Sequence, residues 1–393
     1  MTRSPSPTAT ISLDDAARDD WELVVLGAGP AGAMTAREAA RQGIRVLLVD
    51  RSRFPRPKVC GCCVNQAALG VLTEAGLGDV PTSLGGRPLR AFQLASQGRL
   101  AEVPLGGGVA VSREQLDAAL IEAAIEAGAQ FLDATQALLR PALDCRIELK
   151  RQHAQRTIAA RLAIVATGLG SRCVATDTPD ARHSSPRSRI GAGAVIDEQS
   201  DAYASGIIYM ACHRSGYVGL VRLEDGRLDI AAALDPAAVK RLGGIPAAVS
   251  QVIEQSGLPP ISGLKLQDWH GTAKLTQHRP ALYGDGYLVV GDAAGYVEPF
   301  TGEGIAWALA TGKAVVPYAV RAMAEPDALK RRQVGASWSR EHQRLVGRRM
   351  AVCRSVSFLL RRPRLVRWAV WALARRPQLA APLEWSLNAP FTF

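Results

Sequence analysis

The sequence predicts an α/β protein in which an antiparallel sheet is inserted into a parallel-sheet domain and a helical region ends the chain. Three observations indicate this arrangement. Continuous apolar runs that stop at glycine-containing turns begin near residues 21 and 287, as is typical of buried parallel strands. Short β-like runs separated by turns fill residues 190–234. A basic segment with interleaved apolar residues follows residue 330.

The first structured stretch has the pattern of a βαβ unit. An apolar run from Trp21 leads into Gly27-x-Gly29-x-x-Gly32, a helical pattern and a second apolar run that ends at Asp50. The first glycine permits a tight turn, the second lets backbone approach a pyrophosphate, and the third lets the helix pack on the strand. Phosphates are attracted to the helix N-terminus, and Asp50 can accept hydrogen bonds from ribose hydroxyls. A Rossmann-type dinucleotide-binding unit is therefore predicted.

A further helix and two more buried strands continue this domain. Ser112 is a suitable N-cap with Gln115 three residues later, and Gly128 is a stop, which predicts a helix over 112–129. Apolar runs at 163–168 and 287–292 predict strands that end at glycine-containing turns. The strands expected within the insertion are 207–212, 217–222 and 228–234.

These patterns divide the chain into four parts. We expect a disordered tail, a discontinuous nucleotide-binding domain, an inserted substrate domain and a basic helical C-terminal region. Their expected limits are 1–20 for the tail; 21–77, 101–175 and 271–320 for the nucleotide-binding domain; 78–100 and 176–270 for the substrate domain; and 321–393 for the C-terminal region.

Length and composition are those of a globular protein with a large core. The chain has 393 residues, of which 48% are hydrophobic and 21% charged. No apolar run reaches the roughly 18 residues that a membrane-spanning helix needs. The first 20 residues lack the apolar segment of a secretory signal. We therefore expect a cytoplasmic protein rather than an integral membrane protein.

The seven cysteines suggest reduced thiols. Three of them, Cys60, Cys62 and Cys63, stand within one tetrapeptide, and the others are scattered singly. Because no second Cys-x-x-Cys pair exists, the spacing does not predict a zinc site. The six histidines show no ligand spacing either, and we expect no metal.

The net charge of +11 is concentrated near the C-terminus. Residues 330–376 contain 14 Lys or Arg and one acidic residue, Glu341, so this segment carries +13 and the remainder sums to −2. Large apolar residues, including Trp368 and Trp371, interleave with these arginines. Two interpretations stay open: an interfacial helix on an anionic membrane surface, or a lid that packs its apolar face on the body. No nucleic-acid-binding module is visible, so we expect no nucleic acid partner.

A second motif lies near residue 300. The segment from Gly291-Asp292 to Gly302-x-Gly304, followed by a helical pattern, resembles the second FAD motif of the geranylgeranyl reductase and aromatic hydroxylase superfamily. The resemblance implies that Asp292 holds the ribityl chain and that the turn from Pro299 to Gly304 lies against the isoalloxazine. A helix N-terminus there stabilises the anionic reduced ring.

Three other stretches are similar to the same family. They are Arg51 to Gly61, which contains Phe-Pro-Arg-x-Lys-x-Cys-Gly; the helix beginning at Ser112-Arg113; and Ala166-Thr167-Gly168 at a strand end. With the fingerprint, the resemblance implies FAD as cofactor and the following cofactor-binding residues: Gly27, Gly29, Pro30, Ala31, Gly32, Asp50, Arg51, Lys58, Arg113, Thr167, Gly168, Gly291, Asp292, Pro299, Gly302, Gly304 and Ile305.

Cys60 is the candidate catalytic residue. The resemblance brings its loop to the flavin, where a thiol could donate a proton to a reduced alkene or line the substrate pocket. The alternative is a small buried apolar residue. Lys58 is either a phosphate or flavin-carbonyl contact or a solvated charge, and Cys62 and Cys63 are interpreted as packing residues.

The implied activity is that of an FAD-dependent oxidoreductase. With one dinucleotide fingerprint, NAD(P)H would bind only transiently as reductant. The first hypothesis is a monooxygenase that hydroxylates a small lipophilic aromatic or polyketide-type substrate through a flavin C4a-hydroperoxide. The second is a geranylgeranyl-reductase-like enzyme that reduces isoprenoid double bonds by hydride transfer from flavin N5. The third is a non-catalytic flavin-bearing protein at the membrane surface.

Two departures from the family motifs bear on the ranking of these three hypotheses. Strand 216–222 lacks the tryptophan motifs of geranylgeranyl reductases and halogenases, and Gly295 stands where many aromatic hydroxylases have histidine. Halogenation is therefore not expected, the missing tryptophan motif weighs slightly against prenyl reduction without excluding it, and the match to the aromatic hydroxylases is imperfect as well.

Overall fold

The computed structural model describes residues 4–170, 173–175, 183–197, 201–298 and 300–393. Its main sheet has a parallel centre in the order β20 (Tyr287–Val289), β11 (Ala154–Val165), β1 (Trp21–Leu26), β2 (Val46–Val49) and β8 (Gln130–Leu132). The short strand β19 (Tyr283–Gly284) pairs antiparallel at one edge, and β9 (Gln136–Arg140) and β10 (Cys145–Arg151) extend β11.

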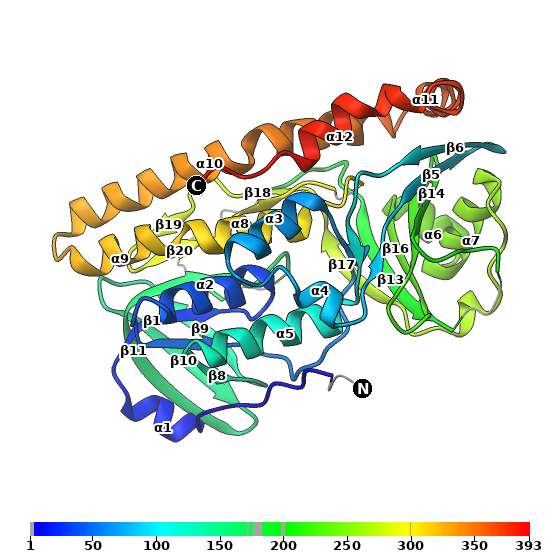
Figure 1. The fold of residues 1–393 in the computed structure, drawn as a ribbon. Helices are drawn as coiled ribbons and strands as arrows, with labels where there is room; N and C mark the ends of the chain where they lie inside the picture. The colour runs from blue at the N-terminus through cyan, green and yellow to red at the C-terminus, as the bar shows by residue number, and fades with distance from the viewer. Residues whose placement is uncertain (1–3, 171–172, 176–182, 198–200, 299) are drawn as a thin grey trace.

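Helices cover this sheet because its central strands are apolar on both faces. Leu23 to Val25 are fully buried, and so are Leu47 and Leu48. The covering helices are α2 (Pro30–Ala40), α5 (Arg113–Glu126), α8 (Gly304–Ala314) and α9 (Val316–Ala324), with α3 (Gln66–Glu74) beside α8 (Figure 1). The α/β fold class with a Rossmann-type unit is confirmed.

A second sheet forms the other half of the molecule (Figure 1). Its seven strands are, in order, β17 (His270–Lys274), β13 (Ile190–Ile196), β16 (Leu228–Leu234), β15 (Gly216–Arg222), β14 (Ile207–His213), β5 (Ala91–Ser96) and β6 (Arg99–Pro104). All pairings are antiparallel except that of β14 with β5. One face packs on α7 (Ile245–Ser256), next to α6 (Pro236–Leu242). The inserted antiparallel sheet thus exists, and it recruits β6 and β17, which the sequence assigned mainly to the nucleotide-binding domain.

Short elements connect the two halves. Two three-stranded sheets are formed by β3 (Cys63–Val64), β7 (Val109–Ala110) and β4 (Arg87–Pro88), and by β12 (His183–Ser184), β18 (Gln277–His278) and β21 (Gly295–Tyr296). The remaining helical turns are α4 (Val80–Ser83), η1 (Leu264–Leu266), η2 (Gly291–Ala294) and η3 (Pro377–Ala380).

The prediction that residues 1–20 form a disordered tail is wrong for residues 13–18. Residues Leu13–Arg18 form helix α1, capped by the Ser12 side chain, which accepts a hydrogen bond from the amide of Asp15. Leu13 and Ala16 are buried, and the Thr10 amide donates to the carbonyl of Phe131. A cap and two apolar residues therefore anchor a segment whose composition alone resembles a loose tail.

The C-terminal region is helical and is part of the core. It contains α10 (Ala328–Leu359), α11 (Pro363–Arg375) and α12 (Ala381–Asn388). In Figure 1, α10 runs along the top of the molecule and leads to α11 above the second sheet. Trp338 of α10 is fully buried, and its indole donates to the carbonyl of Val289 at 3.0 Å. No helix in the described part of the chain combines the length and apolarity needed to cross a bilayer.

Candidate active site

The loop after β1 is built so that only glycine fits at two positions. Gly27 has φ +105°, and a Cβ on it would lie 2.5 Å from the carbonyl oxygen of Ala166. A Cβ on Gly32 would overlap the carbonyl oxygen of Gly27. Pro30 and Ala31 open α2, with Gly29 as its N-cap. The loop therefore holds the N-terminus of α2 tightly against β1, with its free N–H groups at the sheet edge.

Asp50 stabilises this loop from the end of β2. Its carboxylate accepts hydrogen bonds from the amides of Ala28 and Ser52, both at 2.8 Å. Each carboxylate oxygen keeps a further lone pair for a ligand hydroxyl. Arg51, in contrast, is exposed, and no hydrogen bond or ion pair to it occurs among the described residues.

Two arginines face the glycine loop. Arg113 at the start of α5 makes a bidentate ion pair with the fully buried Asp117, at 2.7 and 2.8 Å, and Arg56 lies 3.4 Å from the same carboxylate. Guanidinium nitrogens of both arginines lie within 4 Å of the position a Cβ on Gly29 would take. The buried Nε of Arg56 has no hydrogen-bond partner within the described chain. One carboxylate thus holds two cations beside a helix N-terminus, which suits an anionic phosphate.

The second motif forms a turn against α2. Gly291 has φ +59°, and a Cβ on it would lie 2.8 Å from the Cβ of Ala31. Its amide donates to the Thr311 hydroxyl of α8 at 3.1 Å. Gly302 has φ +71°, and α8 begins at Gly304 with Ile305 buried behind it. The start of α2 therefore lies against Gly291 of the second motif and against Gly312 near the end of α8, whereas Pro299 lies outside the described residues.

The strand end at Thr167 completes this edge of the sheet. The Thr167 Cα lies 3.0 Å from the position of a Cβ on Gly27, and Gly168 follows with φ +70°. The Thr167 hydroxyl lies 3.7 Å from the sulfur of Cys173.

Lys58, Cys60, Arg113 and Asp292 interact electrostatically. Burial raises the pKa of Asp292 to about 6, although Lys58 and Arg113 lower it. The side chain of Lys58 is accessible, but the surrounding protein lowers the pKa of its amine, and Arg113 and Arg56 lower it further. The candidate catalytic cysteine and three predicted cofactor ligands therefore share one site.

Cys60 is ionised at neutral pH. Hydrogen bonding by the Cys62 thiol and the positive charge of Arg113 lower the pKa of Cys60 to about 5, against the opposing effect of burial. The same interaction and burial raise the pKa of Cys62 well above its usual value. Cys62 has φ +51°, and its sulfur lies 3.7 Å from the carbonyl oxygen of Cys60. Both Cys60 and Cys62 belong to an apolar cluster with Leu89, Val221 and Leu223.

Asp229 of β16 adds a buried acid to this cluster. It is 5% exposed, and its Oδ2 has no hydrogen-bond partner among the residues described. Burial and the negative charges of Cys60 and Glu224 raise its pKa well above the usual value, despite the nearby Cys62 thiol. Burial and the neighbouring negative charges therefore favour the protonated form of Asp229.

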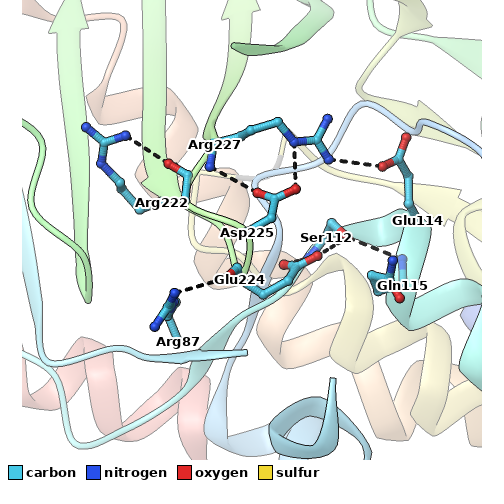
Figure 2. A network of polar contacts seen from close by, with 9 residues as sticks. Arg87, Ser112, Glu114, Gln115, Arg222, Glu224, Asp225 and Arg227 are labelled. Carbon is cyan, nitrogen blue, oxygen red and sulfur yellow. Dashed lines mark hydrogen bonds and ion pairs between the residues drawn. The ribbon is translucent and has the colours of Figure 1, made fainter. Parts of the chain in front are cut away.

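A polar network ties the second sheet to α5 (Figure 2). The carboxylate of Glu224, in the turn between β15 and β16, accepts hydrogen bonds from the Ser112 amide at 2.8 Å and hydroxyl at 2.6 Å. Ser112 in turn caps α5 through the Gln115 amide. On the same turn, Arg227 pairs with Asp225 at 2.6 Å. Since Arg113 is the first residue of α5, this network fixes its position.

Glu303 joins the turn of the second motif, residues 291–304, to the C-terminal helices. It is 1% exposed and accepts hydrogen bonds from Asn65 at 2.7 Å, Trp307 at 3.0 Å and Arg349 of α10 at 3.0 Å. Burial raises the pKa of Glu303, and Arg349 opposes that effect. Arg349 also donates to the carbonyls of Leu387 and Ala389.

The site fits FAD. Its glycine loop leaves room for a pyrophosphate, Arg56 has an unused buried donor, and Asp50 and Asp292 lie where hydroxyl groups can be bound. No group of three or more metal-ligating side chains occurs in the part of the chain that is described.

The pattern of the family described as "FAD binding domain" matches residues 20–311, well over half of the chain. The chain belongs to this FAD-binding family. The flavoprotein is 28% identical over 391 residues to menaquinone reductase of Mycobacterium tuberculosis, covering 91% of this chain and 87% of the relative. It is 27% identical over 322 residues to digeranylgeranylglycerophospholipid reductase 2 of Methanopyrus kandleri, covering 78% of this chain and 79% of the relative.

Solved flavoproteins share its fold. The myxobacterial chondrochloren halogenase matches with a TM-score of 0.75 at 19% identity, over 95% of this chain and 94% of the halogenase. A probable FAD-dependent monooxygenase from Pseudomonas aeruginosa matches with a TM-score of 0.65 at 17% identity, over 90% and 100%. With its reductase relatives, these similarities identify the flavoprotein as an FAD-dependent oxidoreductase.

Sequence reasoning missed several residues of this site. Arg56 and Asp117 stand in two of the stretches that resemble the family, so the sequence did offer a signal for this ion pair. Asp229 and Glu303 gave no signal, because only the fold shows that a carboxylate on a strand or turn is buried.

Proposed function

We propose that this flavoprotein reduces carbon–carbon double bonds in an isoprenoid lipid, with NAD(P)H as the reductant. The reductase relatives are similar over most of both chains, whereas the halogenase and monooxygenase structures are similar in fold at under 20% identity. This reverses the order of the two hypotheses drawn from the sequence, in which hydroxylation came first.

The observation that carries the proposal is the buried acid Asp229 beside the Cys60 loop. Reduction of an alkene adds a hydride to one carbon and a proton to the other, so the protein must supply an acid. FAD, when bound, would supply the hydride, with NAD(P)H as its reductant. The lowered pKa of Cys60 makes its thiol a poor proton store at neutral pH, whereas the pKa values of Asp229 and Cys62 are both raised, which favours their protonated forms.

These protons can be shared along a short path. The Cys62 thiol interacts with both Asp229 and Cys60, so a proton that Cys62 gives to the substrate carbon can be replaced from Asp229, which regains a proton from solvent before the next turnover. Leu89, Val221 and Leu223 pack around the buried Cys62, whereas Cys60 and Cys63 are partly exposed. Arg113, held by Asp117, stabilises the Cys60 thiolate between turnovers.

Product analysis under anaerobic conditions tests the proposal. The FAD-loaded protein is incubated with NAD(P)H and a geranylgeranyl-chain lipid or menaquinone in deuterated water. We expect a saturated bond in the product without oxygen, with one solvent deuterium for each bond reduced. Substrate-dependent oxygen uptake with oxygen in the product would instead establish a hydroxylase. A flavin that NAD(P)H never bleaches, with either lipid present, would establish a non-catalytic protein.

Substitution of the acid provides a second test. Asp229→Asn should lower kcat by about a hundredfold, the usual size of a lost general acid, while the flavin spectrum stays unchanged. Asp225→Asn, in the exposed turn of the same hairpin, is the matched control and should keep its activity. Equal activity of both variants would remove Asp229 from the mechanism.

A further inference from the structure

The C-terminal region presents an unusual exposed surface. Of the fifteen large apolar side chains that are exposed within the described residues, nine lie between Phe358 and Phe393. Trp368 is 64% exposed, Trp371 40% and Trp385 66%. Isolated exposed apolar residues need no explanation, but a concentration of this kind marks an interaction surface.

Helix α11 divides its residues between two faces. Val366 and Val370 are buried against the second sheet, in a cluster with Leu94, Met210 and Tyr217. The opposite face carries Arg364, Trp368, Trp371 and Arg375, which follow the helical spacing of four, three and four residues, together with Arg367. This exposed face, called here the Arg–Trp face, contains no acidic residue.

The arginines of this face have no acidic partner within the described residues. No ion pair to Arg364, Arg367 or Arg375 occurs among the described residues, whereas Arg361 at the base of the helix pairs with the buried Glu298 at 2.9 Å. The guanidinium of Arg375 lies 4.0 Å from the ring centre of Trp371. Such stacking holds the guanidinium and the indole side by side on the helix surface. Tryptophan and arginine side chains are found together at this depth in membranes, at the boundary between lipid head groups and acyl chains.

We infer that the Arg–Trp face of α11 binds the surface of an anionic lipid bilayer. The arginines meet the lipid phosphates, and the two tryptophans enter the head-group region. Charge complementarity selects this partner, because a second copy of the chain would bring the same positive charge to the contact. The inference concerns binding and does not depend on the reaction catalysed.

The surface lies on the outside of the second sheet. The buried face of α11 covers Tyr217 and Phe300. Arg361, just before the helix, pairs with Glu298 in the turn of the second motif. Docking through the outer face would therefore bring this end of the second sheet against the bilayer (Figure 1).

Co-sedimentation with vesicles tests the inference. The full-length, FAD-loaded protein is mixed with phosphatidylcholine vesicles that contain or lack phosphatidylglycerol. We expect binding only to the anionic vesicles, with weaker binding at higher salt. Replacing Arg364 and Arg367 together by Gln should weaken binding about thirtyfold, since each cation near an anionic surface contributes about fivefold. Replacing Trp368 and Trp371 together by Ser should weaken it by at least tenfold.

Matched controls exclude a general loss of structure. Leu266→Ala removes an apolar side chain that is 88% exposed beside α7, away from α11, and Arg146→Gln removes an exposed arginine of β10. Both should bind as the unchanged protein does, and every variant should keep its flavin absorbance and melting temperature.

Three outcomes would overturn the inference. One is equal binding to neutral and anionic vesicles. Another is a dimer in sedimentation equilibrium that the tryptophan variant abolishes, without vesicle binding. The third is salt-dependent binding to duplex DNA in place of vesicles.

Discussion

At the scale of single residues, the site depends on groups whose neighbours were fixed by the fold. Gly27 and Gly32 leave no room for a side chain, because backbone carbonyls occupy the space. Cys60 becomes a thiolate through Cys62 and Arg113, which come from its own loop and from α5. The glycine pattern was readable from the sequence, but the ionisation state of the cysteine was not.

Gly32→Ala should prevent FAD binding. The added methyl group would overlap the Gly27 carbonyl, so α2 must move away from β1, at a cost of at least about 2 kcal/mol in folding stability. Flavin absorbance and the melting temperature measure the effect. Gly70→Ala, where no atom lies within 4 Å of the new Cβ in helix α3, should be neutral or slightly stabilising. A yellow, stable Gly32→Ala protein would contradict the close packing described here.

The Cys60 thiol should react with iodoacetamide at unusually low pH. Its rate of alkylation should follow a titration with a midpoint near 5, because only the thiolate is nucleophilic. Arg113→Gln should move this midpoint upward by removing a positive charge. Mass spectrometry of the labelled peptide gives the rate, with Cys60→Ser as the blank. A midpoint near the ordinary thiol value in the unchanged protein would exclude the thiolate.

At the scale of elements, contacts between distant segments position the site. The turn between β15 and β16 caps α5 through Glu224, and α10 holds the start of α8 through Arg349 and Glu303. The sequence predicted several helices and strands one at a time: α5 was expected at 112–129 and is observed at Arg113–Glu126. The links between these elements could not be predicted, because the residues they join are more than forty positions apart in the chain.

Glu224→Gln should destabilise the N-terminus of α5. The change replaces a charged acceptor of two hydrogen bonds by a neutral one, at a cost of about 1–2 kcal/mol. FAD affinity should fall as well, because Arg113 begins this helix. Urea unfolding and flavin titration give the two quantities. Asp225→Asn breaks only an exposed pair and should change stability by less than about 0.5 kcal/mol; a similar effect of both substitutions would refute the capping role.

At the scale of the whole molecule, the C-terminal helices join the two halves and complete the core. The sequence left open whether the basic segment was a lid or an interfacial helix, and treated it as separable. Trp338, Val346 and Cys353 of α10 are all at most 2% exposed, so removing this region would expose the main core. Surface substitutions on α11, and not truncation, are therefore the suitable test of membrane binding.

Global stability should fall in acid through His342. This side chain of α10 is 6% exposed, packs its ring 5.8 Å from that of Trp338, and has a pKa lowered by burial to about 4. The unfolded chain takes up the proton below about pH 6.5 while the folded protein does not, so stability is lost between pH 6.5 and about 4. The loss is about 1 kcal/mol per pH unit.

His342→Gln should reduce the slope of unfolding free energy against pH in that range. Urea unfolding at several pH values measures this slope. His153→Gln, at an exposed position, is the control and should leave the slope unchanged. An unchanged slope in His342→Gln would assign the acid sensitivity to other groups.

The sequence by itself determined the βαβ unit, the glycine loop, Asp50 and the second FAD motif, because strand periodicity and glycine spacing are local properties of the chain. Tertiary structure alone decided that Asp229 is a buried acid with a raised pKa and that residues 13–18 form a packed helix. It also decided that the basic C-terminal helices cover the core with one face and leave arginine and tryptophan exposed on the other. Burial and charge pairing are set by residues distant in the chain, so a local sequence pattern does not predict them.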